Sequence, residues 1–360
     1  MKILIVQDYL RSGGTERQSV LLANAFAAAG HNVTLLTFRP GGPLAPTVSP
    51  QVTHRSLQSF DTKLDWFAPG LIRHIERQLP DIILLMGRMA NCYGQGIIKE
   101  TRDRWPRLAV IGTMRTGKNL PRLFRFSLRH VHHIVANSHA AKLNLQQKLR
   151  LPGEKITVIP NSLVFPGRIL ARDADLRRQH GADHRTCVLL DVAMFRPEKN
   201  QRELITIAAG LPADFNWQLW LAGDGPARRA CEHLASSLGV EAKVKFLGLV
   251  RDPTPLYAAA DVAVHTSRSE SLSNFLIEAQ AHGLPAVAYA AQGIDECMLP
   301  GETGAVIPRD DQEAFRRAIR QFAKPDPARS ERARTFARTT FDPHRQVQAY
   351  LDLFADLTHS

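Results

Sequence analysis

The sequence predicts an α/β protein built from two doubly wound parallel sheets. Short apolar runs of strand length alternate with longer amphipathic runs from the first residues onward, which is typical of parallel β-α-β units. The same alternation resumes after residue 168. A chain of 360 residues also exceeds the length that one hydrophobic core usually organises, so two domains are expected.

The first sheet is expected in the N-terminal half. An apolar run over 3–6 is the first strand, and an amphipathic run over 16–29, ended by Gly30, is the helix that follows. Further strands are expected where short apolar runs recur, at 32–37, 81–85, 109–112 and 134–136. The start of the chain lacks the long apolar region of a signal peptide, and no run approaches the roughly 20 apolar residues that span a bilayer. We therefore expect a cytoplasmic protein.

The second sheet is expected after residue 168, with strands at 188–192, 218–222, 243–246, 262–265 and 286–289. The linker is expected at 159–167, where two prolines and a glycine bracket the last apolar residues of the first half. Near the end of the chain, Asp342 is a good helix N-cap, proline follows it, and the pattern is amphipathic. These features predict an N-terminal domain over 1–165, a C-terminal domain over 166–340 and a terminal helix within 341–360.

The formal charge of +12 is unevenly distributed. Residues 1–165 hold 22 Lys and Arg against 9 Asp and Glu, so the N-terminal half carries the whole excess. From Pro121 onward its apolar and basic residues fall near helical spacing, which predicts a basic amphipathic helix. A core-facing helix with a solvated cationic side is the alternative. The charge favours contact with an anionic membrane surface, on the inner face of the cell membrane.

Several other classes of site are not indicated. The four cysteines are widely separated, and no histidine spacing matches a metal-binding motif, so neither a disulfide framework nor a metal site is expected. Nucleic acid is another conventional partner of a basic protein. However, the sequence has no helix-turn-helix, zinc-finger or aromatic RNA-binding motif, so no nucleic-acid partner is expected.

Two carboxylates eight positions apart flank a predicted junction between loop and helix. Glu270 lies in the loop, and the helix is expected to begin near Ser273 or Asn274, both good N-cap residues. Backbone amides at a helix N-terminus favour anions, so Leu272, Ser273 and Asn274 are candidates to hold a diphosphate. Glu278, one turn inside the helix, is placed to accept hydrogen bonds from a ribose, and Glu270 from a sugar. For an arbitrary pair with this spacing, two solvated glutamates are the more common outcome.

The stretch from Glu270 to Pro285 resembles the Glu-x7-Glu signature of retaining glycosyltransferases with the GT-B fold, particularly family 4. This resemblance implies two Rossmann-like domains facing a cleft. The acceptor would bind to the N-terminal domain and a nucleotide-sugar (NDP-sugar) donor to the C-terminal domain, and the terminal helix would cross back to the first domain. It also implies that the anomeric configuration is retained and that no metal takes part, so no cofactor is expected beyond the donor substrate.

A glycine pair opens the first predicted helix. Gly13, Gly14 and Thr15 directly follow the first strand. Paired glycines permit a tight turn, and a helix N-terminus favours an anion. The pattern is not G-x-G-x-x-G, so a dinucleotide cofactor is not supported. Alone, the turn is as consistent with structural punctuation as with binding, but it resembles the GGxE loop of family 4. That resemblance implies a contact of Gly14 with the donor and of Gly13 and Thr15 with phosphate or acceptor.

Two cations follow the first strand of the C-terminal domain. Arg196 and Lys199 are placed to neutralise a leaving diphosphate, the role of a divalent metal in many other glycosyltransferases. The family pattern has arginine at the position of Met194, so Arg196 replaces it only in part. A surface loop with two solvated cations is the alternative.

Two turns resemble those beside the nucleotide in the family. Gly223 would allow close approach of the donor, and Leu249 and Val250 would flank the base. In the N-terminal domain, Arg115 stands near the point where many relatives have histidine. It would suit an anionic acceptor or a donor phosphate, or it would belong to the general basic surface.

The sequence therefore predicts a glycosyl transferase that moves a sugar from an NDP-sugar to a glycan or glycolipid acceptor, in cell-envelope polysaccharide, lipopolysaccharide or lipid-linked glycan synthesis. Glu270 would orient the sugar and steady positive charge at its anomeric carbon, while Lys199 and Arg196 stabilise the diphosphate. The alternatives are a nucleotide-sugar epimerase of the same fold and, less favoured, a nucleic-acid-binding protein.

Overall fold

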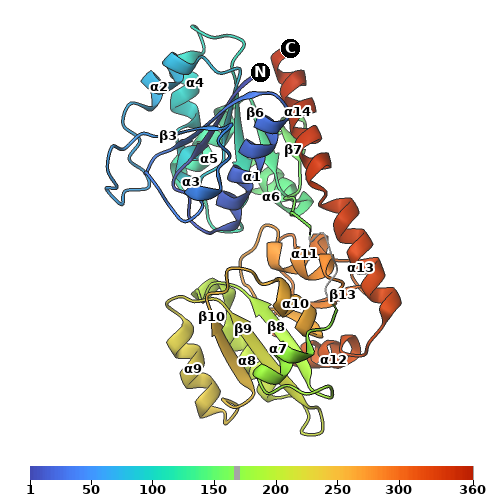
Figure 1. The fold of residues 1–360 in the computed structure, drawn as a ribbon. Coiled ribbons are helices and arrows are strands. Elements are labelled where there is room, and N and C mark those ends of the chain that lie inside the picture. Colours follow the sequence, from blue (N-terminus) through green and yellow to red (C-terminus); the bar gives the residue numbers. More distant parts are fainter. Residues whose placement is uncertain (166–170, 360) are drawn as a thin grey trace. The chain divides into compact units, whose positions relative to one another are not determined.

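The computed structural model describes residues 1–165 and 171–359. The chain forms two compact units, the first made of Met1–Ser162 and Pro343–Ser360 and the second of Leu163–Asp342 (Figure 1). The end of the predicted linker and the predicted start of the second domain, at 166–168, lie outside the described residues. None of the helices in the described part of the chain has the length and apolar character needed to cross a membrane.

The first unit is built on a seven-stranded parallel sheet in the order β3-β2-β1-β4-β5-β6-β7. Its strands are β1 (Lys2–Gln7), β2 (Asn32–Thr37), β3 (Thr53–Ser56), β4 (Ile82–Leu85), β5 (Ala109–Met114), β6 (His133–Ala136) and β7 (Ile156–Val158). Its helices are α1 (Gly14–Ala28), α2 (Leu71–Gln78), α3 (Arg88–Cys92), α4 (Gly94–Thr101), α5 (Arg122–His130), α6 (His139–Leu149) and α14 (Pro343–His359), with short 3-10 turns at Ala45–Thr47 and Gly153–Lys155.

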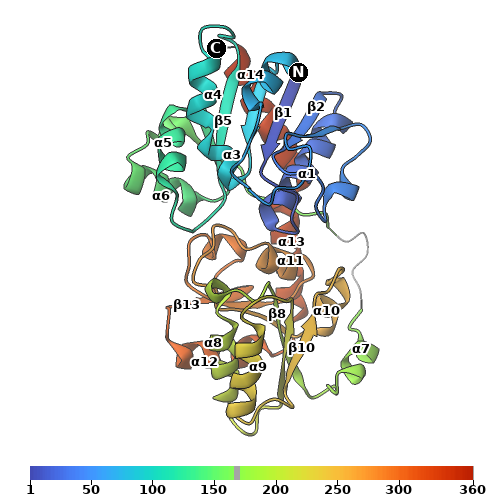
Figure 2. The ribbon, with the colours of Figure 1, turned by 90° about the vertical axis from the view of Figure 1, so that its left-hand side faces the viewer.

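Both faces of this sheet are covered by helices. Because successive side chains of a strand point to opposite faces, Ile5 packs in the core shared with α1 and α14, whereas Val6 packs under α2 to α6. Figure 2 shows α3, α4 and α5 on this second side. On the first side, the ring of Phe26 in α1 lies 6.0 Å from that of Tyr350 and 5.5 Å from that of Phe354. These aromatic contacts fasten the terminal helix α14 to the first unit.

The second unit is built on a six-stranded parallel sheet in the order β10-β9-β8-β11-β12-β13. Its strands are β8 (Cys187–Val192), β9 (Trp217–Ala222), β10 (Val244–Gly248), β11 (Val262–His265), β12 (Ala286–Tyr289) and β13 (Gly304–Ile307). Its helices are α7 (Ala174–Gln179), α8 (Gln201–Ala209), α9 (Arg228–Ser237), α10 (Thr254–Ala259), α11 (Asn274–Ala281), α12 (Gln312–Phe322) and α13 (Pro327–Thr340), with 3-10 turns η3 (Pro197–Lys199) and η4 (Asp295–Cys297). One core lies under α7, α10, α11 and α13, and the other under α8, α9 and α12.

The prediction of two doubly wound parallel sheets is confirmed. Three strands, β3, β7 and β13, were not predicted, and all three lie at an edge of their sheet. An edge strand pairs on one side only, so it can be short or polar: β3 reads Thr-His-Arg-Ser and β7 has three residues. Neither produces the apolar run by which the central strands are recognised.

Each sheet reverses its winding direction once, between β1 and β4 in the first unit and between β8 and β11 in the second. At such a switch point the loops that leave the carboxyl ends of the two strands diverge, and the crevice between them is the usual binding site of an open α/β sheet. In the second unit, these loops contain Lys199 and Glu270.

Candidate active site

The loops that follow β8 and β11 are hydrogen-bonded to one another. The Arg268 backbone N–H donates to the Glu198 carbonyl over 2.8 Å, and the Thr266 hydroxyl donates to the Asn200 carbonyl over 2.9 Å. The Ser267 hydroxyl also donates to the Glu198 carbonyl, over 3.2 Å. The switch point is therefore a preorganised piece of backbone that presents side chains from both strands.

Lys199 and Glu270 meet at this point. The Lys199 Nζ donates to Glu270 Oε1 over 2.5 Å, and the Glu270 side chain is only 9% exposed, compared with 26% for Lys199. Burial raises the pKa of Glu270, but the positive charge of Lys199 and the hydrogen bond from His265 outweigh it and bring the pKa down to about 2. Glu270 is thus a buried, fully ionised carboxylate at neutral pH.

Two residues of this site were missed by sequence reasoning. His265, the last residue of β11, lies between Asp191 of β8 and Glu270: its Nδ1 is 3.0 Å from Asp191 Oδ1, and its Nε2 is 2.9 Å from Glu270 Oε1. All three side chains are buried. The available signal was a titratable residue at the end of each of two otherwise apolar central strands, where a charge is costly unless it is paired.

The predicted helix start is confirmed. Ser273 is the N-cap of α11, and its hydroxyl accepts from the Leu276 backbone N–H. The Ser273 backbone N–H donates to the sulfur of Cys297 over 3.3 Å. Leu272 and Ser273 are buried, and Asn274 is half-buried. The amide that Ser273 would offer to a diphosphate therefore already has a thiol acceptor.

Glu278 is half-buried on α11, and Tyr257 in α10 donates its hydroxyl to Glu278 Oε2 over 2.6 Å. The Tyr257 ring in turn stacks on Phe275 and on His282. This packing within the second unit orients Glu278, the second glutamate of the signature.

The contact of Gly223 with the donor stays a prediction, and the structure shows a separate reason for glycine at this position. A Cβ added at Gly223 would stand 2.0 Å from the Ala193 carbonyl oxygen, and one at Gly225 would stand 2.4 Å from the Phe195 carbonyl oxygen. Their φ angles are +142° and +149°. The close approach that these glycines permit is that of the protein's own loop 193–195.

The other residues predicted near the donor are less enclosed. Arg196 is exposed, and Leu249 is 75% exposed. Val250 packs against the core that includes α10 and α11. The structure therefore brings Lys199 to Glu270 but does not bring the Arg196 side chain to the same carboxylate.

The glycine pair of the first unit lies at the start of α1, and its predicted contacts with donor, phosphate or acceptor stay predictions. Gly13 is the N-cap residue of α1 with φ of −77°, and α1 begins at Gly14, before Thr15. A Cβ at Gly13 would lie 2.4 Å from Glu16 Oε2, the end of a flexible side chain, so neither a left-handed backbone nor a fixed neighbour requires glycine here. At the end of β1, Asp8 accepts from the backbone N–H groups of Met89 and Ala90 over 3.0 and 2.6 Å. Burial raises its pKa to about 6.

Arg115 has structural partners in the first unit. Its guanidinium donates to Asn161 Oδ1 and, over 2.6 Å, to the Tyr350 hydroxyl of α14. These two hydrogen bonds fix the guanidinium against α14 and the segment that follows β7.

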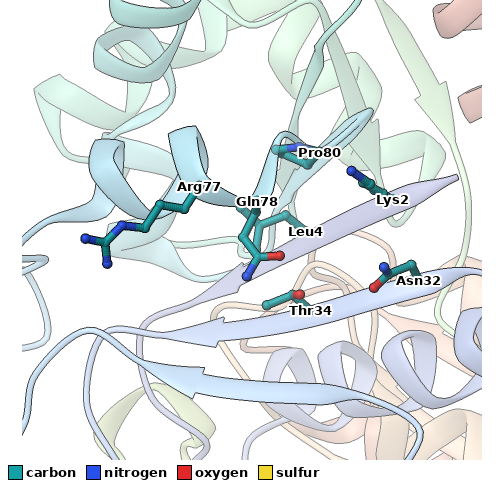
Figure 3. A pocket seen from close by; sticks show the side chains of 7 residues that line it. All are labelled: Lys2, Leu4, Asn32, Thr34, Arg77, Gln78 and Pro80. Carbon is teal, nitrogen blue, oxygen red and sulfur yellow. The ribbon is translucent and has the colours of Figure 1, made fainter.

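A cavity of about 240 Å³ lies at the other end of the first sheet (Figure 3). It is lined by Lys2, Leu4, Asn32, Thr34, Arg77, Gln78 and Pro80. Lys2 and Asn32 begin β1 and β2, so the cavity lies at the amino ends of the strands, away from the edge where open α/β sheets bind ligands.

Comparison with known proteins identifies the family. The Glycosyl transferases group 1 family matches residues 173–340, and Glycosyltransferase Family 4 matches residues 12–163. The lipopolysaccharide core biosynthesis glycosyltransferase LpsE of Rhizobium meliloti is 30% identical over 352 residues, which cover 96% of each chain. The chain belongs to the group 1, family 4 glycosyltransferases.

Further relatives agree with this assignment. This glycosyltransferase is 23% identical over 360 residues to the lipopolysaccharide glucosyltransferase WaaG of Escherichia coli, with 92% of each chain covered. Its fold matches the crystal structure of Anabaena HepE in complex with UDP with a TM-score of 0.80, at 21% identity, over 99% of this chain and 100% of HepE. The fold is therefore GT-B.

Proposed function

We propose that this glycosyltransferase transfers a sugar from an NDP-sugar to a hydroxyl of a glycan or glycolipid in cell-envelope synthesis, with retention of configuration and without a metal ion. The observation that carries the proposal is the buried, ionised Glu270, held by Lys199 at the switch point of the second unit. The names of LpsE and WaaG support an envelope glycan as the acceptor, and the UDP bound to HepE supports a nucleotide-linked donor.

The proposed chemistry is the retaining transfer that the family resemblance implies. The bond between the anomeric carbon and the diphosphate oxygen breaks, and the acceptor oxygen bonds to that carbon from the same face. The acceptor's hydroxyl proton passes to the leaving diphosphate. Glu270 stabilises positive charge at the sugar, and Lys199, whose ammonium has three donors, serves Glu270 and the diphosphate together, with Arg196 as a further cation. Within the second unit, the donor would also use Leu272 to Asn274 and Glu278.

The test is a panel of UDP-, GDP- and ADP-sugars. Donor binding should raise the melting temperature in proportion to occupancy. The donor so found is then incubated with and without lipopolysaccharide core or lipid-linked acceptors, and NMR reads the anomeric configuration of the product. Transfer that persists in EDTA supports the metal-free reaction. Conversion of the donor without acceptor would instead indicate an epimerase, and inversion would reject retention.

We also propose that the first unit contacts an anionic membrane surface through α5. Phe124 and Leu128 of this helix are buried, whereas Leu123 is 64% and Phe126 46% exposed. The exposed side also carries three arginines, Arg122, Arg125 and Arg129. Each cation near an anionic surface contributes about 1 kcal/mol.

Sedimentation with phosphatidylglycerol-containing and neutral liposomes tests this contact. Changing these three arginines to glutamine should lower the fraction of protein that sediments with the anionic liposomes and should not change the fraction that sediments with the neutral ones. The matched control changes three exposed arginines of the second unit to glutamine, Arg185, Arg317 and Arg320, and should sediment with the anionic liposomes as the wild type does. Equal binding to both kinds of liposome would reject an electrostatic contact.

A further inference from the structure

A buried chain of four side chains crosses the switch point of the second unit. It runs from Asp191 through His265 and Glu270 to Lys199, with separations of 3.0, 2.9 and 2.5 Å between successive polar atoms. Asp191 and His265 come from β8 and β11, which are hydrogen-bonded neighbours in the sheet. Asp191 and His265 are almost fully inaccessible, at 1% and 2% exposure.

Hydrogen-bond chemistry determines the protonation of the ring. An ionised carboxylate only accepts, whereas a neutral imidazole has one donor and one acceptor nitrogen. Because a carboxylate faces each ring nitrogen, both nitrogens must donate, and the ring is an imidazolium. The four side chains then carry alternating charges that sum to zero, and buried charges are tolerated when they are paired in this way.

Two other groups near His265 and Glu270, the Phe275 ring and the Cys297 thiol, are uncharged. From α11 the ring faces Phe275, whose centroid is 5.6 Å away and which carries no charge. Cys297 in η4 has its pKa raised by burial, so its thiol stays protonated and uncharged near Glu270. The groups that titrate against the ring are therefore Asp191, Glu270 and, through Glu270, Lys199.

The geometry also selects one oxygen of Glu270. His265 Nε2 and Lys199 Nζ both bond to Oε1. Within residues 1–165 and 171–359, the structure shows no hydrogen bond to Glu270 Oε2. Two converging cations hold the carboxylate in a single orientation and leave Oε2 for an incoming hydroxyl.

We propose that His265 is a permanently protonated positioning residue that Asp191 holds in place and that fixes Glu270 for the donor sugar. This inference rests on the proposed function for the role of Glu270, but not for the charge of the ring. The neighbouring carboxylates offset the effect of burial and raise the pKa of His265 above its usual 6.5. Both carboxylates therefore favour the protonated ring.

The first experiment reads the ring directly, without substrate. Protein labelled with ¹⁵N in histidine is titrated by NMR from pH 6 to 9.5, and the signal of His265 is assigned with His265→Gln. We expect protons on both ring nitrogens at pH 7.5. Asp191→Asn should lower the pKa of the ring, because one of its two counter-charges is lost. His133, a buried strand histidine of the first unit whose pKa is lowered mainly by burial, is the neutral reference.

The second experiment reads the positioning role. Misplacing Glu270 should lower kcat on the order of 10²-fold in His265→Gln, with a much smaller change in KM. In Asp191→Asn the alkaline limb of the rate profile should move toward neutral pH. His133→Gln should leave both properties unchanged, and circular dichroism shows whether each variant is folded.

The outcomes separate the two proposals. A neutral His265 ring in the wild type at pH 7.5 would overturn the inference, as would wild-type kcat and pH profile in both variants. A charged ring in a protein that accepts no NDP-sugar would reject the proposed function and leave the assigned charge intact.

Discussion

Glu270→Gln is the substitution whose effect can be worked out most fully from the structure. It keeps the shape of the side chain but removes the negative charge between Lys199 and His265, two cations that then face each other across a neutral amide. The pKa of the carboxylate falls from 4.5 to about 2 on folding. At about 1.4 kcal/mol per pKa unit, the ionised carboxylate stabilises the fold by roughly 3 kcal/mol at neutral pH, and the variant should lose about this much.

The sign of the pH dependence follows from the direction of the shift. A carboxylate with a lowered pKa contributes stability above its unfolded pKa of 4.5, and this contribution is lost as the pH falls through about 2. The difference between wild type and Glu270→Gln that is due to this carboxylate should therefore be fully present at pH 7 and shrink as the pH falls below 4.5.

Hydrogen exchange read by mass spectrometry on the peptides of β8 and β11 measures this difference within the second unit. Glu313→Gln is the matched control, because Glu313 pairs with Arg316 at the surface of the same unit and is 63% exposed. Its loss should cost less than 1 kcal/mol. Equal protection of wild type and Glu270→Gln at pH 7, or a difference that persists undiminished at pH 3, would refute the reasoning.

Three further predictions follow from the same structure. Lys199→Ala should reduce transfer on the order of 10²-fold while circular dichroism stays unchanged, because it removes a preorganised charge contact; wild-type turnover would reject the assigned role. Gly223→Ala should lower the melting temperature more than Gly239→Ala does. Both glycines have positive φ, but only a Cβ at Gly223 would meet a backbone oxygen. Equal losses would show that loop 193–195 can move away from the added Cβ. Arg115→Met should speed hydrogen exchange in α14, whose Tyr350 it holds, and unchanged exchange would mean that the aromatic contacts suffice.

Much of the fold could be predicted because its central strands are buried on both faces and are therefore apolar in sequence. The same reasoning failed at β3, which is polar, and at β7, which is three residues long. The N-cap at Ser273 could be predicted because capping depends on the local chain alone.

The two wound sheets could be predicted, and Glu270 and Lys199 singled out, from local patterns of apolar, capping and charged residues. That Asp191 and His265 join Glu270 and Lys199 is visible only in the folded protein, because the two strands that carry these residues are far apart in the chain and adjacent in the sheet. The folded protein likewise shows that Gly223 makes room for the chain itself and that Arg115 is bonded to α14. These roles arise from contacts across long sequence separations, which a linear pattern does not encode.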